Sequence, residues 1–403
     1  MKYVVILGDG MADYPIESLG GKTPLAVANK PYIDSLAKIS QVGLAKTVPN
    51  GLKPGSDVAN LSVLGYDPLK GYTGRSPLEA ASIGIALKDT DVTARANLVT
   101  LSGEEDYADK TMVDYSAGEI STAEAKELIE YLKKYLDDDI YTLYAGISYR
   151  HCLVVDKGSV LGDLTPPHDI TGKPVEQYLP KGEKGAKYLS LMEKSYQLLK
   201  NHPVNLDRIK RGKNPANSLW LWGEGTKPSL QNFKDKFGLK GGMISAVDLL
   251  KGIAKLADMQ VIEVDGATGN YDTNFKGKAE ACLNGLLGGL DFVYVHMEAP
   301  DECGHHGDLE RKIYSIEQID GVVKTVCEGL KAKGEDFRML IAPDHPTPIA
   351  IKTHSADAIP YIIYDSRKAV DSVAERYDEE NASRTGIKVD NGYELMQILT
   401  AKN

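Results

Sequence analysis

Cysteine is scarce in this sequence, and long apolar runs are missing. The four cysteines stand at positions 152, 282, 303 and 327, and no two of them have CxxC spacing. This pattern excludes a disulfide scaffold and a thiolate zinc finger, and it favours free thiols in a reducing cytoplasm. No apolar stretch reaches the roughly 18 residues that a membrane span needs. The opening "MKYVVILGDG" is too polar for a secretion signal, so we expect neither a membrane association nor export.

A basic surplus is also missing, because 47 Lys and Arg stand against 57 Asp and Glu, for a formal net charge of -10. Nucleic-acid binding requires a basic surface, so we expect no nucleic-acid partner. An anionic small molecule would have to be held by a few local cationic groups. The length of 403 residues suggests two domains, or one large domain with an insertion.

Strand-like and helical patterns alternate along much of the chain. Helical periodicity occurs at residues 246–257, 276–288 and 308–333. Short runs typical of strands occur at residues 3–7, 260–264, 292–297, 338–343 and 360–364. The alternation predicts an α/β fold with a mostly parallel sheet and helices on both faces.

The middle of the chain has a different pattern, with turn clusters such as "LTPPHDITGKP" around a helical stretch at 121–136 and strand-like residues at 140–155. We interpret residues 92–216 as a smaller α+β domain that binds substrate or closes over it. It would be inserted into a discontinuous metal-binding core made of residues 1–91 and 217–403.

Three of the predicted strands are followed by an aspartate. Asp9 lies in "VVILGDG", Asp301 ends "FVYVHMEAPD" and Asp344 ends "MLIAPD". Ligands of open α/β sheets bind outside the carboxyl ends of the strands, so these carboxylates are expected at one edge of the sheet. Asp9 alone could be a turn residue, and Asp344 alone could cap the next segment.

Histidines accompany these acids, since five of the chain's eight lie between positions 296 and 354. His305 follows Asp301 by one helical turn, so both side chains can point to one side. We assign His296 to packing or to support of a ligand and leave His306 unassigned. The candidate ligands are Asp9, Asp301, His305, Asp344, His345 and His354. Mixed oxygen and nitrogen ligands in this number suit two divalent ions, which can act as a clamp in phosphoryl transfer.

A serine nucleophile is available in "GLKPGSDVANLSVLGYDP", where Ser56 follows Gly55 at the start of a helical pattern. Ser56 could simply be an N-cap. The same position also suits catalysis, because helix N-termini favour phosphate and a nearby metal ion would make the hydroxyl easier to ionise.

Several ordered motifs resemble one family. They are "GDGMAD", "KPGSDVANLSVLGYDP", "VDGATGNYDTNFKGKAEA", "VHMEAPDECGHHGD" and "APDHPTPIAIKTHSADAIPYIIYD". Together they are similar to the cofactor-independent phosphoglycerate mutases of archaeal type, within the alkaline phosphatase superfamily. The similarity covers nearly the whole chain. Cys303 departs mildly from the family pattern, where a small residue such as Ala is usual.

The resemblance implies an alkaline-phosphatase-like core and an isomerase that interconverts 3-phosphoglycerate and 2-phosphoglycerate in glycolysis, with Ser56 as the phosphorylated nucleophile. It implies one ion held by Asp9, Ser56, Asp344 and His345, and a second held by Asp301, His305 and His354. Mn²⁺ is expected first, with Zn²⁺, Co²⁺ or Mg²⁺ as alternatives, and no 2,3-bisphosphoglycerate is required. The inserted domain would exclude water during transfer.

Glycerate would need cationic and hydrogen-bonding partners, and arginine suits a carboxylate. The candidates for substrate binding are Arg95, Asn97, Arg150, His151, Asp163, His168, Asp169, Asn214 and Lys251. Each residue of the inserted region could equally be an ordinary surface residue. Lys251 could bind the transferring phosphate, but a solvated helix lysine is the favoured interpretation.

Two alternatives stay open. The same core could serve a homoserine-kinase-type phosphotransferase or a metal-dependent phosphatase, because a fold does not fix its substrate. The glycine-rich "LGDG" and "VDGATGN" could belong to a nucleotide-binding module, although neither has GxGxxG or P-loop spacing. Homo-oligomer formation is compatible with the sequence.

Overall fold

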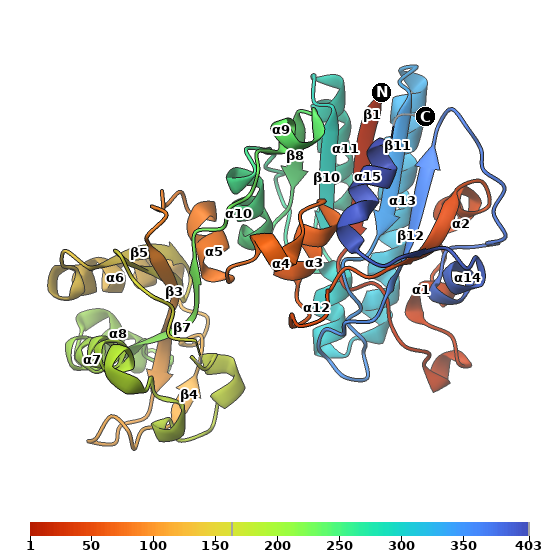
Figure 1. Cartoon of the computed structure of the whole chain (residues 1–403). Helices are drawn as coiled ribbons and strands as arrows, with labels where there is room; N and C mark the ends of the chain where they lie inside the picture. Colours follow the sequence, from red (N-terminus) through yellow and green to blue (C-terminus); the bar gives the residue numbers. More distant parts are fainter. Residues whose placement is uncertain (163, 402–403) are drawn as a thin grey trace. The chain divides into compact units, whose positions relative to one another are not determined.

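The computed structural model describes residues 1–162 and 164–401, which form two compact units (Figure 1). The core unit comprises Met1–Tyr72 and Ser229–Asn403, and the inserted unit comprises Thr73–Pro228. The inserted unit is therefore longer at each end than the expected 92–216. Residues 218–226 account for part of the difference, because they pair with the strand that begins at residue 92.

The core unit contains an eight-stranded sheet. Its pairings are parallel except for the two made by one strand, β12. In spatial order the strands are β13 (Lys388–Val389), β2 (Gln41–Ala45), β12 (Ile359–Asp365), β11 (Phe337–Ala342), β1 (Lys2–Gly8), β10 (Phe292–Met297), β8 (Gly241–Ile244) and β9 (Gln260–Val261). The parallel neighbours β11, β1 and β10 end at the same edge, and this is where the candidate ligands follow.

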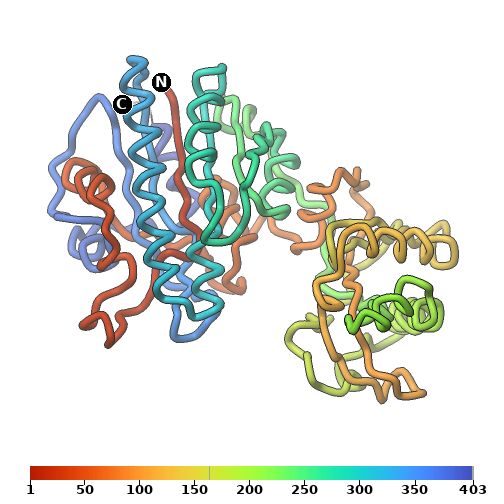
Figure 2. Tube along the Cα trace, turned by 180° about the vertical axis from the view of Figure 1, so that it is seen from behind, coloured from red at the N-terminus to blue at the C-terminus, as the bar shows by residue number. Residues whose placement is uncertain are grey.

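Helices cover both faces of this sheet. Figures 1 and 2 show α2 (Pro31–Ala37), α11 (Phe275–Leu287) and α13 (Leu309–Ala332) on one face, and α3 (Ser56–Val63) and α15 (Leu395–Thr400) on the other. The central strand β1 is buried on both sides, which explains its continuous apolar run. On the first face, Val4 and Ile6 share a core cluster with Ile319 and Val323 of α13.

Shorter elements complete the core unit. They are η1 (Glu17–Leu19), α1 (Pro24–Val27), α4 (Pro68–Gly71), α9 (Phe233–Phe237), α10 (Asp248–Leu256), α12 (Ala299–His306), α14 (Glu379–Arg384) and η4 (Gly392–Glu394). Of these, α12 directly follows β10, so it begins at the edge of the sheet where the candidate ligands gather.

The inserted unit has an antiparallel five-stranded sheet. Its strands are β4 (Met112–Asp114), β3 (Val92–Leu101), β6 (Arg150–Val155), β5 (Tyr141–Ile147) and β7 (Ser218–Thr226). Its helices are α5 (Ser76–Ser82), α6 (Thr122–Leu136), η2 (Pro167–Ile170), η3 (Glu176–Tyr178), α7 (Gly182–Leu199) and α8 (Pro203–Lys210). Leu132, Met192 and Trp220 belong to a separate core of this unit.

The expected α/β class, with a mostly parallel sheet and a smaller α+β insertion, is confirmed. The predicted strand at 260–264 is largely wrong, because only Gln260–Val261 pairs. These residues lie at the edge of the sheet with one neighbour, so little hydrogen bonding supports a longer strand.

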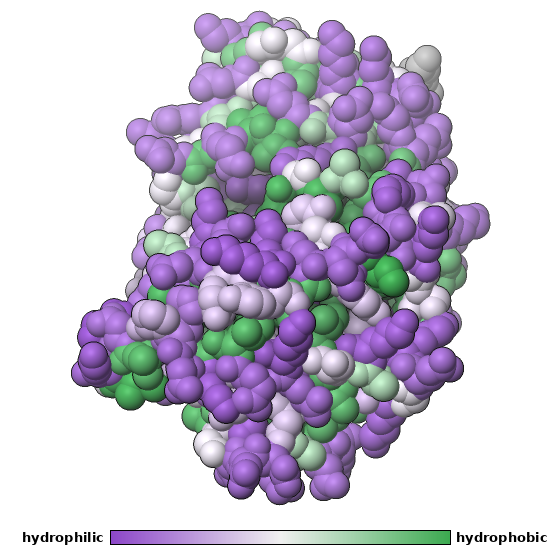
Figure 3. All heavy atoms as spheres, turned by 90° about the vertical axis from the view of Figure 1, so that its left-hand side faces the viewer, coloured by the Kyte–Doolittle hydropathy of each residue, from purple (hydrophilic) through white to green (hydrophobic). Residues whose placement is uncertain are grey.

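The described part of the chain has a polar exterior on the face in Figure 3, where hydrophobic side chains form separate patches among hydrophilic ones. The four cysteines are free and buried. Among the described residues, no helix has both the length and the apolar character that crossing a membrane demands.

Candidate active site

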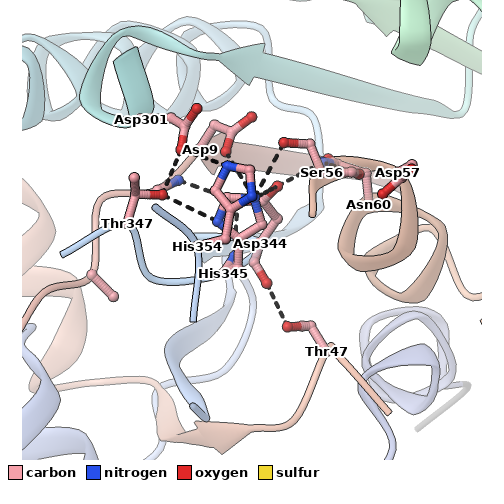
Figure 4. A network of polar contacts seen from close by, with 12 residues as sticks. Asp9, Thr47, Ser56, Asp57, Asn60, Asp301, Asp344, His345, Thr347 and His354 are labelled. Carbon is pink, nitrogen blue, oxygen red and sulfur yellow. Dashed lines mark hydrogen bonds and ion pairs between the residues drawn. The ribbon is translucent and has the colours of Figure 1, made fainter. Parts of the chain in front are cut away.

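The three aspartates that follow strands lie together at one edge of the core sheet (Figure 4). Asp9 comes directly after β1, and Asp344 lies two residues after β11. Asp301 lies in α12, in the segment that follows β10. All three are buried. The parallel pairing of β1 with β10 and β11 brings these ends together, as the sequence predicts.

Asp9, Asp344 and His345 form a first group whose ligand atoms all lie within 4.8 Å of one another. His345 Nε2 is 3.6 Å from Asp9 Oδ1 and 3.4 Å from Asp344 Oδ2. Burial lowers the pKa of His345, so its imidazole is neutral and can offer a lone pair.

Asp301, His305 and His354 form a second group of the same kind. Asp301 and His305 are one turn apart on α12, with His305 Nε2 3.3 Å from Asp301 Oδ2. His354 Nε2 lies 3.5 Å from Asp301 Oδ1 and 3.0 Å from His305 Nε2. Burial opposes ionisation of Asp301, but hydrogen bonds from His305 and His354 outweigh it and hold its pKa well below the usual range.

The orientation of His305 also suits metal binding. Its Nδ1 is 3.0 Å from the carbonyl oxygen of Lys352, which can only accept, so Nδ1 carries a hydrogen and Nε2 faces the group. The hydrogen bond with Asp301 raises the pKa of His305 to about 9. A metal ion at this position would therefore displace a proton.

The hydrogen bonding and charge of the first group suit a bound cation. Asp9 Oδ1 is buried and has no hydrogen-bond partner among the described residues. Burial, followed by the nearby charges of Asp344 and Asp301, raises the pKa of Asp9 well above its usual value. A divalent cation would give this oxygen a partner and offset the repulsion between the acids.

Ser56 is the first residue of α3 and points toward the first group (Figure 4). Its Oγ lies 3.2 Å from His345 Nε2. The cap position is occupied by Gly55, and no side chain caps the helix, so the interpretation of Ser56 as an N-cap is wrong. The hydroxyl thus lies at a helix N-terminus, beside a neutral imidazole.

Asn60 supports this arrangement and was missed in the sequence. Its Nδ2 donates to Asp344 Oδ2 at 2.7 Å and to the Ser56 carbonyl at 2.9 Å. Its Oδ1 accepts from the Tyr294 hydroxyl at 2.6 Å. The available signal was its spacing, one helical turn after Ser56.

His296 orients Asp9, in agreement with the supporting role expected for it. Its Nε2 is 2.8 Å from Asp9 Oδ2, and its Nδ1 is 3.1 Å from Ser245 Oγ. Burial lowers the pKa of His296 to about 3, so the ring is neutral. Nε2–H therefore donates to Asp9, while Nδ1 accepts from the Ser245 hydroxyl. Two threonines, Thr47 and Thr347, also hydrogen-bond within the network and were not predicted.

Some of the substrate candidates gather around Trp222 of the inserted unit, a residue that the sequence did not single out. The Arg95 guanidinium lies 4.1 Å from the Trp222 ring centre, and the His168 ring centre lies 5.3 Å from it. Asn97 Oδ1 accepts from the indole N–H at 3.0 Å. Arg150 pairs with Asn97 in the sheet register. This group, with Arg95, Asn97, Arg150 and His168, is called the Trp222 cluster below.

The other candidates have different surroundings. His151 is buried, with Nδ1 accepting from the Gly146 N–H at 3.0 Å. Asn214 donates to Asp114 at 2.8 Å, and Asp169 is largely exposed beside His168. Lys251 pairs with Glu263 at 2.8 Å, which agrees with an ordinary helix lysine. Asp163 lies outside the described residues.

Comparison with known proteins gives consistent results. A model of the 2,3-bisphosphoglycerate-independent phosphoglycerate mutase family matches residues 37–205. A protein of that name from Methanothrix thermoacetophila is 50% identical, over 100% of both chains. Another from Methanosarcina barkeri is 49% identical, over 99% of each.

This chain belongs to the 2,3-bisphosphoglycerate-independent phosphoglycerate mutase family.

Solved structures agree with the family assignment. A protein from Pyrococcus horikoshii has a TM-score of 0.82 and 29% identity, covering 100% of this chain and 98% of its own. A cofactor-independent phosphoglycerate mutase from Thermoplasma acidophilum has a TM-score of 0.66 and 26% identity, covering 99% of each chain. The two relatives align with 99% and 100% of this chain. The similarity therefore covers both units and extends beyond the residues 37–205 that the family model matches.

Proposed function

We propose that this chain interconverts 3-phosphoglycerate and 2-phosphoglycerate through a phosphoserine at Ser56, independently of 2,3-bisphosphoglycerate. The observation that carries the proposal is the position of Ser56 Oγ, 3.2 Å from His345 Nε2 at the edge where both Asp/His groups lie. The chain's identity of 50% to a mutase relative over its whole length supports the choice of substrate.

Two divalent ions would be bound by the two groups. Asp9, Ser56, Asp344 and His345 would hold one, and Asp301, His305 and His354 the other. The donors combine carboxylate oxygen with imidazole nitrogen, which favours Mn²⁺, with Zn²⁺, Co²⁺ or Mg²⁺ as alternatives. When bound, such ions supply charge neutralisation to the phosphoryl group and make the serine hydroxyl easier to ionise.

Ser56 would act as the nucleophile in two balanced steps. The Ser56 hydroxyl gives up its proton as its oxygen forms a bond to phosphorus, while the bond from phosphorus to the C3 oxygen of glycerate breaks and that oxygen takes up a proton. The glycerate then turns, and its C2 hydroxyl loses its proton as its oxygen attacks the phosphoserine. The bond from phosphorus to the Ser56 oxygen breaks in this step, and Ser56 recovers a proton. The N-terminal N–H groups of α3 stabilise phosphate at this position.

The Trp222 cluster would bind the glycerate carboxylate and hydroxyls. Arg150 provides positive charge, and Arg95, whose guanidinium also pairs with Glu79 at 2.9 Å, provides further N–H donors. Asn97 is held in place by its bond with the Trp222 indole. Retention of glycerate while it turns requires that water stay away from the phosphoserine, and we assign this role to the inserted unit. The four free cysteines support a reducing, cytoplasmic location.

The test is to incubate the purified protein with Mn²⁺ and 3-phosphoglycerate and to follow the products by ³¹P NMR. We expect 2-phosphoglycerate to form until the two isomers reach equilibrium, with little inorganic phosphate. Release of phosphate without 2-phosphoglycerate would instead establish a phosphatase. Phosphorylation of homoserine from ATP, with no isomerisation, would establish the kinase-type alternative.

A further inference from the structure

Thr347 lies between the two Asp/His groups and contacts both. Its hydroxyl hydrogen-bonds Asp301 Oδ1, a member of the second group (Figure 4). The same oxygen is 3.3 Å from Nδ1 of His345, a member of the first group. The Thr347 side chain is fully buried. Among the described residues, Asp301 and His345 are therefore the hydrogen-bond partners of its hydroxyl.

We propose that the Thr347 hydroxyl is a positioning group that couples the two metal-binding groups by orienting His345 and Asp301 at once. The inference rests on the proposed metal-dependent function, which it deepens by adding a residue that belongs to neither ligand set. Thr347 would touch neither the ions nor the substrate.

The direction of each hydrogen bond follows from elementary chemistry. The Asp301 carboxylate can only accept, so the Thr347 O–H must donate to it. The Thr347 oxygen is then free to accept, and its partner is Nδ1–H of His345. A neutral imidazole with hydrogen on Nδ1 has a bare Nε2. That nitrogen faces Ser56 Oγ at 3.2 Å, so Thr347 selects the His345 tautomer that can bind a metal ion.

The backbone of Thr347 is fixed by its neighbours. Its N–H donates to the Ala12 carbonyl at 3.3 Å. Its carbonyl accepts from Lys312 Nζ at 2.7 Å, and this buried lysine pairs with the buried carboxylate of Asp13 at 2.7 Å. The backbone of Thr347 is thus held in place by a buried ion pair.

The side chain of Thr347 is confined by two glycines. A Cβ on Gly10 would lie 2.5 Å from the Thr347 hydroxyl oxygen, and a Cβ on Gly304 would lie 2.8 Å from its methyl carbon. The hydroxyl and methyl therefore occupy fitted positions next to backbone, and the side chain has little room to rotate. The hydroxyl is held where it can serve both partners.

Loss of the hydroxyl alone should weaken both groups. In Thr347→Val the shape is kept, but His345 loses the acceptor that selects its tautomer, and Asp301 loses a donor. Loss of a residue that hydrogen-bonds a metal ligand typically lowers metal affinity about 10–100-fold. We therefore expect both Mn²⁺ ions to bind about 10–100-fold more weakly. The metal-free protein should also unfold at a lower urea concentration, because the buried Nδ1–H of His345 is left without an acceptor.

Thr347→Ser is the matched control, because it keeps the hydroxyl and removes the methyl group that packs on Gly304. It should bind two Mn²⁺ ions with nearly wild-type affinity while the metal-free protein becomes less stable. Mn²⁺ binding is measured by electron paramagnetic resonance and calorimetric titration, and stability by urea unfolding of the chelated protein. Thr347→Ala provides a second hydroxyl-free variant if the valine protein does not fold.

Three results would overturn the inference. They are wild-type Mn²⁺ affinity in the hydroxyl-free variants, equal weakening in the serine variant, or weakening of one ion alone. Because binding is measured without substrate, the result is independent of the mutase assay. A wild-type protein that binds two ions but does not isomerise phosphoglycerate would refute the proposed substrate and leave the role of Thr347 intact.

Discussion

Ser56 Oγ and His345 Nε2 lie 3.2 Å apart, although 289 positions separate the two residues in the sequence. The serine begins helix α3, whereas the histidine follows strand β11. Asn60 joins the same two elements through its bond to Asp344. The contact thus places a hydroxyl at a helix N-terminus next to carboxylates and imidazoles, which suits the proposed phosphoryl transfer to Ser56.

Replacement of Ser56 by alanine should abolish isomerisation and preserve most metal binding. The Asp and His ligands remain, but no oxygen is available to form the phosphoserine. We expect kcat to fall by about a thousandfold or more, as for loss of other nucleophiles. Turnover of 3-phosphoglycerate and bound Mn²⁺ are measured on the same sample. Ser62→Ala, in the same helix, is the control, and normal turnover in Ser56→Ala would rule out the phosphoserine route.

Asp344→Asn should remove one of the two ions. The change keeps the size of the side chain but removes the negative charge that faces His345 and Asp9. The affinity for that ion should fall by more than the ~10–100-fold expected when a residue that only supports a ligand is lost. Activity should fall in parallel. Mn²⁺ titration checks the stoichiometry, with Asp106→Asn at an exposed position as the control. Two tightly bound ions in Asp344→Asn would contradict its assignment as a ligand.

Arg150→Ala should weaken substrate binding without affecting the metal ions. Arg150 is exposed next to Asn97 in the Trp222 cluster, so its loss should not disturb the fold. A charge-assisted hydrogen bond is worth about 1.5–3 kcal/mol, so the KM for 3-phosphoglycerate should rise roughly tenfold or more. Steady-state kinetics and Mn²⁺ titration test this, with exposed Arg384→Ala as the control. An unchanged KM would remove Arg150 from the substrate site.

His151 should make the inserted unit sensitive to acid. Burial, aided by Arg150, lowers the pKa of His151 from 6.5 to about 3. The unfolded chain therefore binds more protons between these two values, so the stability present above pH 6.5 is lost progressively as the pH falls toward 3. Between pH 7.5 and pH 5, this effect should lower the free energy of unfolding by roughly 2 kcal/mol.

His151→Asn should reduce this loss, because asparagine can still accept from Gly146 but does not titrate. The measurement is urea unfolding of chelated protein followed by tryptophan fluorescence, since both tryptophans, Trp220 and Trp222, report on the inserted unit. The exposed His306→Asn variant should behave like the wild type. Equal acid sensitivity in His151→Asn and the wild type would mean that another group is responsible.

The sequence alone determined the class of the fold and the edge of the sheet that carries the site. Buried strands such as β1 and β10 appear as continuous apolar runs because both faces are covered. The aspartates after parallel strands had to meet, because the carboxyl ends of such strands share one edge. The pairing of Asp301 with His305 also followed from local spacing, since one helical turn separates them.

Only the tertiary structure showed that Thr347 and Asn60 support the candidate ligands, and where the units divide. Thr347 contacts Asp301 and Asn60 contacts Asp344, and no periodic pattern reports these contacts between residues distant in sequence. Likewise, β7 joins the inserted unit because it pairs with β3, and strand pairing depends on register across the sheet. Local sequence patterns determine elements and their faces, whereas contacts between distant elements are set by strand order and packing.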